Sequence, residues 1–295
     1  MAILRLFGLY FLLTLLMVIV GSVAGTYFGS DPFSGMIFFL VFAIAINFFS
    51  YFYSDKLVLR AYGAKIIERN DNPRLYGIVK KIADLNDLST PRIAIVNSST
   101  PNAFATGRNP KNAVVAATTG LMSILDDHEL EGVMAHEMAH VKNRDTLVMC
   151  AAATIAGAIA FAARMLWWNS MFSGGRNRNV HPVLLILVAL TAPLAAFLLQ
   201  MAVSRSREFH ADTTAAKLTN KPWALISALK KLEWENHRKP LDCGSPSYAA
   251  MCIVNPLRGG DFFISMFSTH PPMEKRISEL ERFCLLYTSP SPRDA

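Results

Sequence analysis

Charged residues are scarce in this sequence. They make up 17% of its 295 residues, whereas soluble globular proteins average about 25%. Hydrophobic residues make up 52%, and much of that excess lies in a few long runs. The composition therefore indicates a membrane protein that carries a soluble portion.

Cysteine is scarce as well, with four residues in all. No two of them form a Cys-x-x-Cys pair, and the chain is long, so a disulfide framework is not expected. Cys243 and Cys252 could pair, although two reduced thiols are the simpler interpretation.

Two binding signatures are absent. The net charge is +7, but neither a long basic block nor an aromatic–basic stripe accompanies it, so nucleic-acid binding is not expected. The chain also contains no Gly-x-x-x-x-Gly-Lys-Ser/Thr phosphate loop. We therefore expect no use of ATP.

Two apolar runs open the chain. The first, Leu6–Ala24, is uncharged and at ~1.5 Å per residue covers roughly 28 Å, close to the hydrocarbon thickness of a bilayer. The second, Phe33–Tyr53, follows after a short connection. The two runs predict a transmembrane hairpin. A cleaved signal peptide is the alternative for the first run, because Arg5 precedes it and Ser22-Val23-Ala24 offers small residues.

Basic residues indicate the orientation of this hairpin. Arg5 precedes the first run, and Lys56, Arg60 and Lys65 follow the second, whereas the connection between the runs has neither Lys nor Arg. The positive-inside bias places both ends of the hairpin, and the soluble portion that follows, in the cytoplasm.

Two further runs, Leu147–Ala163 and Val180–Val203, make up a second hydrophobic segment. The loop between them contains Arg176 and Arg178, which would lie outside, against the positive-inside bias, if both runs crossed the membrane. Two membrane spans are one interpretation. A hairpin that dips into the membrane or packs in protein is the other.

The remaining sequence shows mixed helix and strand patterns. Apolar residues at helical spacing predict an amphipathic helix over Pro73–Leu88. The other expected elements are strands at Arg92–Asn97 and Ala113–Ala116, and helices at Gly120–Leu125, from His128 onward, at Ser204–Leu218, at Trp223–Asn236 and at Pro272–Phe283. The final residues, Leu285–Ala295, lack periodicity and look like appended sequence.

The motif His136-Glu137-Met138-Ala139-His140 carries the chemistry. Histidines four residues apart lie on one face of a helix, within about 6 Å, which is the geometry that two imidazoles need to bind one tetrahedral zinc ion. Glu137 lies on a neighbouring face, where it could take a proton from a water on the metal and pass it to the leaving amine. This pattern is a signature of zinc peptidases.

A third ligand is needed, and Glu208 is the best candidate. Asp212 lies one helical turn later on the same face, which suits a carboxylate that accepts a hydrogen bond from a ligand imidazole. The alternative is that both carboxylates pair with Arg205 and Arg207 on a wet face. His210 is two residues from Glu208, so on a helix it points elsewhere.

Two further features concern the surroundings of this site. His270 precedes two prolines, which would hold it rigidly as a hydrogen-bond donor to the transition state, although a turn at a helix start explains the residue equally well. His140 and Glu208 lie just before and just after the second hydrophobic segment, each separated from it by roughly 9 Å of helix. The zinc site should therefore lie just off the membrane face.

Together these features resemble the HtpX-type membrane metalloproteases, which are kin of the prenyl-protein endopeptidases. The resemblance runs from Arg5 to about Phe283. It rests on the amino-terminal hairpin and on the motifs Asn102-Ala103-Phe104-Ala105-Thr106-Gly107, His136 to His140, Asn143 with Asp145, Ser206-Arg207-Glu208 with Ala211-Asp212, and Thr269-His270-Pro271-Pro272.

The resemblance implies a cytoplasm-facing zinc endopeptidase of the inner (plasma) membrane that acts on misfolded or damaged membrane proteins. One zinc ion per chain would be bound by His136, His140 and Glu208, and Glu137 would be the catalytic acid and base. An edge strand beside the site would be formed by Asn102, Ala103, Phe104 and Ala105. An extended substrate would add to that strand through backbone hydrogen bonds.

We therefore expect a mainly α-helical integral membrane protein with a gluzincin-like α+β metalloprotease domain that carries a small β-sheet. The expected division is a transmembrane hairpin at 1–55, a first protease part at 56–145, a second hydrophobic hairpin at 146–203, a second protease part at 204–284 and a non-native tail at 285–295. A narrower prenyl-protein processing endopeptidase would share every metal residue and stays an alternative. A non-catalytic membrane scaffold is the other alternative, against which an intact Glu137 argues.

Overall fold

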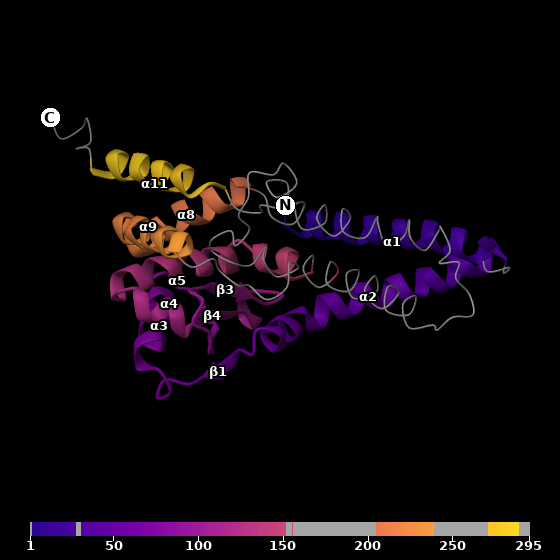
Figure 1. Ribbon diagram of the computed structural model, residues 1–295, viewed down its shortest axis with the longest axis horizontal. Coiled ribbons are helices and arrows are strands. Elements are labelled where there is room, and N and C mark those ends of the chain that lie inside the picture. The colour runs from indigo at the N-terminus through magenta and orange to yellow at the C-terminus, as the bar shows by residue number, and fades with distance from the viewer. Residues whose placement is uncertain (1, 28–30, 152–154, 156–204, 239–270, 289–295) are drawn as a thin grey trace.

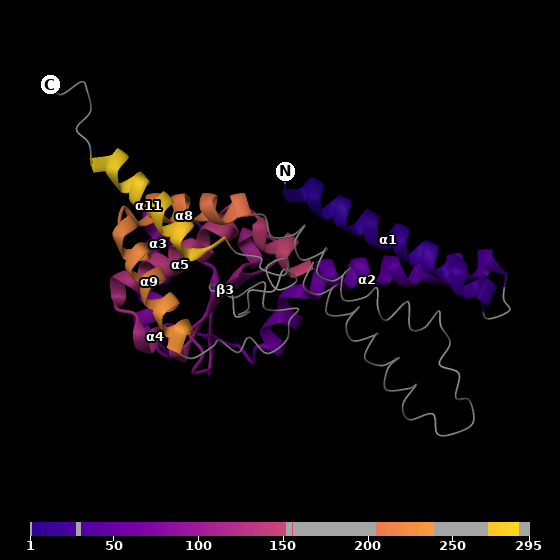
Figure 2. The ribbon, with the colours of Figure 1, turned by 45° about the horizontal axis from the view of Figure 1, so that its top comes forward.

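The computed structural model describes residues 2–27, 31–151, 155, 205–238 and 271–288. In this part of the chain, two long helices project as a hairpin from a group of shorter helices and a small sheet (Figures 1 and 2). The predicted fold class is confirmed. The second hydrophobic segment lies almost entirely outside the described residues, so both interpretations of it stay predictions.

The hairpin consists of α1 (Ala2–Tyr27) and α2 (Pro32–Ala61). The Asp31 side chain caps α2 by accepting a hydrogen bond from the backbone N–H of Ser34, and Pro32 suits the first helical position. Within the described residues, α2 is the one helix whose length and mean hydropathy of 2.1 would allow it to cross a membrane. It continues past the predicted end of the apolar run and so carries the chain from the hairpin into the soluble portion.

A four-stranded mixed sheet follows, with the order β1-β2-β4-β3. The strands are β1 (Lys65–Ile67), β2 (Arg92–Val96), β3 (Ala103–Thr106) and β4 (Val114–Thr118). The β2 and β4 strands run parallel, with Ala94 opposite Ala116, and the outer strands pair antiparallel with them. The predicted strands correspond to β2 and β4. The sequence pattern did not predict β1, because three residues are too few to show alternation.

Helices pack around this sheet (Figure 1). They are α3 (Pro73–Leu85), the 3-10 turn η1 (Pro110–Asn112), α4 (Thr119–Ile124), α5 (Asp127–Lys142), α8 (Arg205–Thr219), α9 (Pro222–Arg238) and α11 (Met273–Thr288). The predicted helices of the soluble portion are confirmed to within a few residues. Their apolar faces share one core, which includes Leu75, Val115, Met134, Leu229 and Leu280.

Helix α5 is central to this core, and residues 129–141 of it are all buried. Its Gly132 permits a close approach to α9, since a Cβ at that position would lie 2.8 Å from the backbone nitrogen of Leu225. Helices α3, α8 and α9 all pack against α5. Segments far apart in the sequence thus meet around α5, while the division into the five predicted domains stays a prediction.

Candidate metal centre

A capping box sets where α5 begins. The Asp126 side chain accepts from the backbone N–H groups of His128 and Glu129, and the Glu129 side chain accepts in return from the backbone N–H of Asp126. Such reciprocal bonds satisfy the otherwise unpaired donors at a helix start. The helix then runs without interruption through His136 and His140, which both point into the protein with 3% and 4% of their surface exposed.

The two histidines meet Glu208 of α8. The Nε2 atoms of His136 and His140 lie 3.3 Å apart. A Glu208 oxygen, Oε2, lies 3.6 Å from Nε2 of His136, and Oε1 lies 3.4 Å from Nε2 of His140. The structure therefore brings together the three predicted ligands, and all three are buried.

These separations fit a tetrahedral zinc ion. Zinc-to-ligand distances of about 2.0–2.1 Å place neighbouring ligand atoms roughly 3.3 Å apart. Two imidazole nitrogens and one carboxylate are also the donor set of catalytic zinc sites, which keep a fourth position open. The three residues form a zinc site of the His₂Glu kind.

The charge around the site supports the same assignment. Four carboxylates and two guanidinium groups gather there, and the side chains are Glu137, Asp145, Glu208, Asp212, Arg207 and Arg276. With both imidazoles neutral, as zinc ligands must be, this leaves two formal negative charges in a buried place, where an unbalanced charge is costly. One divalent cation would balance them.

The Asp212 side chain supports His136, as predicted for a carboxylate that orients a ligand. Its Oδ1 lies 2.9 Å from Nδ1 of His136. Burial alone would lower the pKa of His136, but the charge of Asp212 and the hydrogen bonds that Asp212 and Glu208 accept from the imidazole outweigh it and raise that pKa. Neither Glu208 nor Asp212 lies on a wet face, since they are 1% and 2% exposed.

A second buried group, Arg276 of α11, was missed by the sequence reasoning. Its Nη2 donates to Oδ1 of Asp212 at 2.6 Å and its Nε to Oδ2 at 2.8 Å. Burial would raise the pKa of Asp212, but the adjacent guanidinium lowers it, so the carboxylate stays ionised. One signal was available: Arg276 occupies a position between Met273 and Leu280 on the apolar face of its helix.

His140 has a similar support, formed by Asp145 and Arg207. Both residues belong to motifs named in the sequence analysis, but no role was predicted for them there. Oδ2 of Asp145 lies 3.5 Å from Nδ1 of His140, and Nη1 of Arg207 donates to Oδ1 of Asp145 at 3.1 Å. Burial would lower the pKa of His140, yet the Glu208 charge and the Asp145 hydrogen bond raise it to about 10. Without a metal ion, a proton would therefore be held in this acidic site.

The structure also locates the other predicted residues. Glu137 is 6% exposed and follows the ligand His136 on α5. His210 is exposed and is not part of the ligand group. His270 lies outside the described residues, so its role stays a prediction.

The predicted substrate strand corresponds to β3 with the residue before it. Ala103, Phe104 and Ala105 belong to the strand, which lies at one edge of the sheet and contacts α5. Asn102 precedes it and pairs with Thr118 at the end of β4 through backbone and side-chain hydrogen bonds. All four side chains are buried. Their burial does not test whether a substrate strand pairs with the backbone of this edge, so that role stays a prediction.

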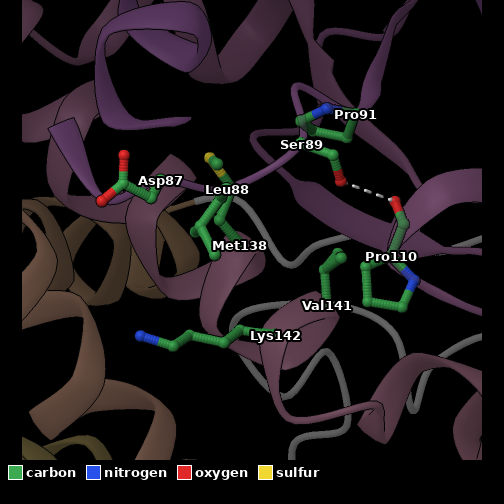
Figure 3. Close-up of a pocket in the computed structure, with 8 residues that line it drawn as sticks. All are labelled: Asp87, Leu88, Ser89, Pro91, Pro110, Met138, Val141 and Lys142. Atoms are coloured by element: carbon green, nitrogen blue, oxygen red, sulfur yellow. Dashed lines mark hydrogen bonds between the residues drawn. The ribbon is translucent and has the colours of Figure 1, made fainter. Parts of the chain in front are cut away.

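A cavity of about 260 Å³ lies beside the carboxyl end of α5 (Figure 3). Met138 and Val141 of α5 face Leu88, Pro91 and Pro110 across it, and Ser89 donates a hydrogen bond to the carbonyl of Pro110. None of the three metal ligands lines this cavity. It is therefore separate from the metal centre.

Comparison with known proteins agrees with the site. The model of "Peptidase family M48" matches residues 69–283. A protease HtpX homolog of Thermococcus sibiricus is 52% identical over 254 residues, which cover 84% of this chain and 87% of that protein. Another, of Methylibium petroleiphilum, is 46% identical over 273 residues, covering 91% and 93%.

Among solved structures, the crystal structure of S. mikatae Ste24p is similar, with a TM-score of 0.48 and 18% identity. The match covers 94% of this chain and 64% of that longer one. The family match and the two HtpX homologs are much stronger evidence. The family model matches most of this chain, and the two homologs are 52% and 46% identical to it over most of both sequences. By these matches the chain belongs to peptidase family M48 and is a zinc metalloendopeptidase of the HtpX type.

Proposed function

We propose that this protease cuts misfolded or damaged membrane proteins close to the cytoplasmic face of the membrane in which it is embedded. One observation carries the proposal. The buried ligand group lies on α5 and α8, and the chain between these helices is the second hydrophobic segment. If this segment enters the membrane, as we propose, it would hold the metal centre close to the membrane from two sides.

The chain's own residues divide the work of hydrolysis. His136, His140 and Glu208 would hold zinc, which when bound lowers the pKa of water and polarises a peptide carbonyl. Glu137 would take a proton from the attacking water and later deliver it to the nitrogen of the leaving amine, so that no net proton is gained or lost. Asp212 and Asp145 would hold the imidazole rings with their Nδ1 protons turned away from the metal.

The substrate is proposed to bind as an extended strand along β3. The position of β3 at the edge of the sheet supports this, because an edge strand can form backbone hydrogen bonds with an added strand. Its contact with α5 would bring the added strand near the metal centre. Backbone pairing reads little of the side-chain sequence, which suits an enzyme that removes damaged proteins of many kinds. The proposed role of His270, a hydrogen bond to the transition state, would be an addition to this arrangement.

The chemistry is tested with Glu137→Gln in the purified full chain. This variant should keep one zinc ion per chain and lose cleavage of an unfolded protein by at least about 1,000-fold, since the acid and base group is gone. Glu274→Gln, an exposed glutamate of α11, is the matched control and should cleave normally. Normal cleavage by Glu137→Gln would refute the mechanism.

The substrate class needs a separate experiment in lipid vesicles that contain the protease. An unfolded soluble domain is compared with the same domain tethered to the vesicle by one apolar helix. The tether raises the local concentration, so the anchored form should be cut at least about 10-fold faster at low substrate concentration. Equal rates in intact vesicles would contradict the membrane-substrate proposal while leaving the chemistry intact.

A further inference from the structure

We propose that Arg276 is a positioning residue of the metal centre, which acts on the zinc ligand His136 through Asp212. The inference rests on the proposed function of the site, because it gives Arg276 its role through a metal ligand. It concerns the carboxyl-terminal helix α11, which none of the sequence motifs for zinc binding includes.

The burial of Arg276 is the first observation. It is 0% exposed and is the largest fully buried side chain among the described residues, while its neighbours Glu274 and Lys275 are exposed. Burying a charge is costly unless partners compensate for it. The carboxylates that pair with Arg276 include Asp212, at 2.6 Å, and Glu208, at 3.9 Å. The guanidinium is therefore held at the metal centre and not at the surface.

The shape of the contact is the second observation. Arg276 binds both oxygens of Asp212 in a two-pronged arrangement, at 2.6 and 2.8 Å. Such a fork fixes the plane of a carboxylate as well as its position. Oδ1 of Asp212 then has a defined direction in which to accept a second hydrogen bond, and Nδ1 of His136 lies there at 2.9 Å.

Fixing Asp212 has a consequence for the ligand atom. A proton held on Nδ1 of His136 leaves the lone pair on Nε2, which is the nitrogen that faces His140 and Glu208. Without Arg276, the Asp212 carboxylate could rotate, and the imidazole would lose its fixed orientation. Arg276 thus contributes to metal binding without touching the metal.

A positioning role and a purely electrostatic role of Arg276 predict opposite changes in zinc affinity when the residue is removed. Nη2 of Arg276 lies only 3.5 Å from the His136 ring nitrogens, so its positive charge repels a cation in the site. If charge alone mattered, removal of Arg276 would tighten zinc binding. If Arg276 positions Asp212, its removal should weaken zinc binding. The sign of the change therefore separates the two accounts.

The test measures metal affinity of the full-length protein in detergent, by competition with a zinc-chelating dye. Arg276→Met should bind zinc about 10- to 100-fold more weakly, the usual range when a residue that orients a ligand is lost. The visible spectrum of the cobalt-substituted protein should change as well, because the ligand geometry loosens. Arg282→Met is the matched control: Arg282 lies on the same helix, is exposed and pairs only with Glu279 among the described contacts, so zinc affinity should not change.

A double variant shows whether Arg276 acts through Asp212. In the Asp212→Asn background, adding Arg276→Met should weaken zinc binding less than twofold further, since the positioning is already lost. Full additivity of the two effects would overturn the proposal. So would unchanged or tighter zinc binding by Arg276→Met.

Arg276→Lys covers the case in which the methionine variant does not fold. Lysine keeps the charge but cannot form the two-pronged contact. It should weaken zinc binding several-fold and alter the cobalt spectrum, while α11 stays as resistant to proteolysis as in the parent protein. Unchanged zinc binding by this variant would contradict positioning. The result is independent of Glu137→Gln, which tests cleavage and leaves the metal in place.

Discussion

The two histidines of the metal centre are supported in the same way but not equally well. Each Nδ1 faces an aspartate that is held by an arginine. Around His136 the contacts are short, at 2.9 Å to Asp212 and 2.6 and 2.8 Å from there to Arg276. Around His140 they are longer and single, at 3.5 Å to Asp145 and 3.1 Å from there to Arg207.

The difference in contact length has its origin in the parts of the fold that carry each aspartate and arginine. Asp212 and Arg276 lie on α8 and α11, which pack into the main core. Asp145 follows the end of α5, and Arg207 lies in the first turn of α8, so these two residues flank the second hydrophobic segment. Nε and Nη2 of Arg207 are buried and have no hydrogen-bond partner among the residues that the structure describes, whereas Arg276 is fully buried and binds Asp212 with two nitrogens. The site is thus fixed on its core side and less constrained on the side that leads to the second hydrophobic segment.

The largest effect should come from Asp212→Ala. It removes the orientation of His136 and also leaves the buried Arg276 charge without its main partner. We expect the free energy of unfolding to fall by about 3–5 kcal/mol and zinc affinity by about 100-fold. Chemical unfolding followed by tryptophan fluorescence, together with metal competition, measures both quantities.

The matching change on the other side, Asp145→Ala, should be milder. Arg207 keeps 12% of its side chain exposed, whereas Arg276 is fully buried, so leaving Arg207 without its carboxylate should cost less stability. Zinc affinity should fall by about 10-fold, at the lower end of the range for residues that orient a ligand. If Asp145→Ala were as damaging as Asp212→Ala in both measurements, the two supports would be equivalent and the comparison would fail.

Of the support around His136, the sequence predicted Asp212 but not Arg276. Asp145 and Arg207, which support His140, appeared in the motifs, but no role was predicted for them. The histidine pair, and Asp212 relative to Glu208, follow from spacing on single helices, because a helix fixes which residues share a face. The choice of Glu208 as the third ligand depended also on the resemblance. Arg276 lies 140 positions from His136, and no local spacing connects them. The available clue was an arginine between Met273 and Leu280, at a position where a helix buries apolar residues. A charge there requires a buried partner of opposite sign, but only the fold identifies that partner.

The same reasoning applies to the sheet. Strands β2 and β4 were predicted because β-branched and small apolar residues make up all of β4 and all of β2 except its first residue, Arg92. The edge strand β3 entered only through the resemblance, since four residues ending in a turn carry too weak a pattern. It pairs antiparallel with β4, the next strand along the chain, and periodicity within one strand does not encode that pairing or its register.

Arg207→Lys should have a smaller effect than either aspartate change. Arg207 makes one contact with Asp145, and a lysine can replace a single contact better than a two-pronged one. We expect zinc affinity to change less than threefold, against the several-fold loss expected for Arg276→Lys. Metal competition on the two variants side by side gives the ratio. A larger loss in Arg207→Lys would reverse the order of the two supports.

The smallest effect on the metal should come from the other end of α5, where Glu129 accepts hydrogen bonds from Lys231 and Ser227. Burial would raise the pKa of Glu129, but these bonds lower it below its ordinary value of about 4.3. The stability that the carboxylate contributes is therefore fully present above the ordinary pKa and is lost as the pH falls through the lower pKa of the folded protein.

Glu129→Gln should reduce the free energy of unfolding by about 1 kcal/mol at pH 7 and by less at pH 3. Zinc affinity at pH 7 should stay unchanged within twofold. A loss of zinc binding as large as that of Asp145→Ala would show that the anchoring of the helix start, and not the local support of each histidine, sets the strength of the metal site.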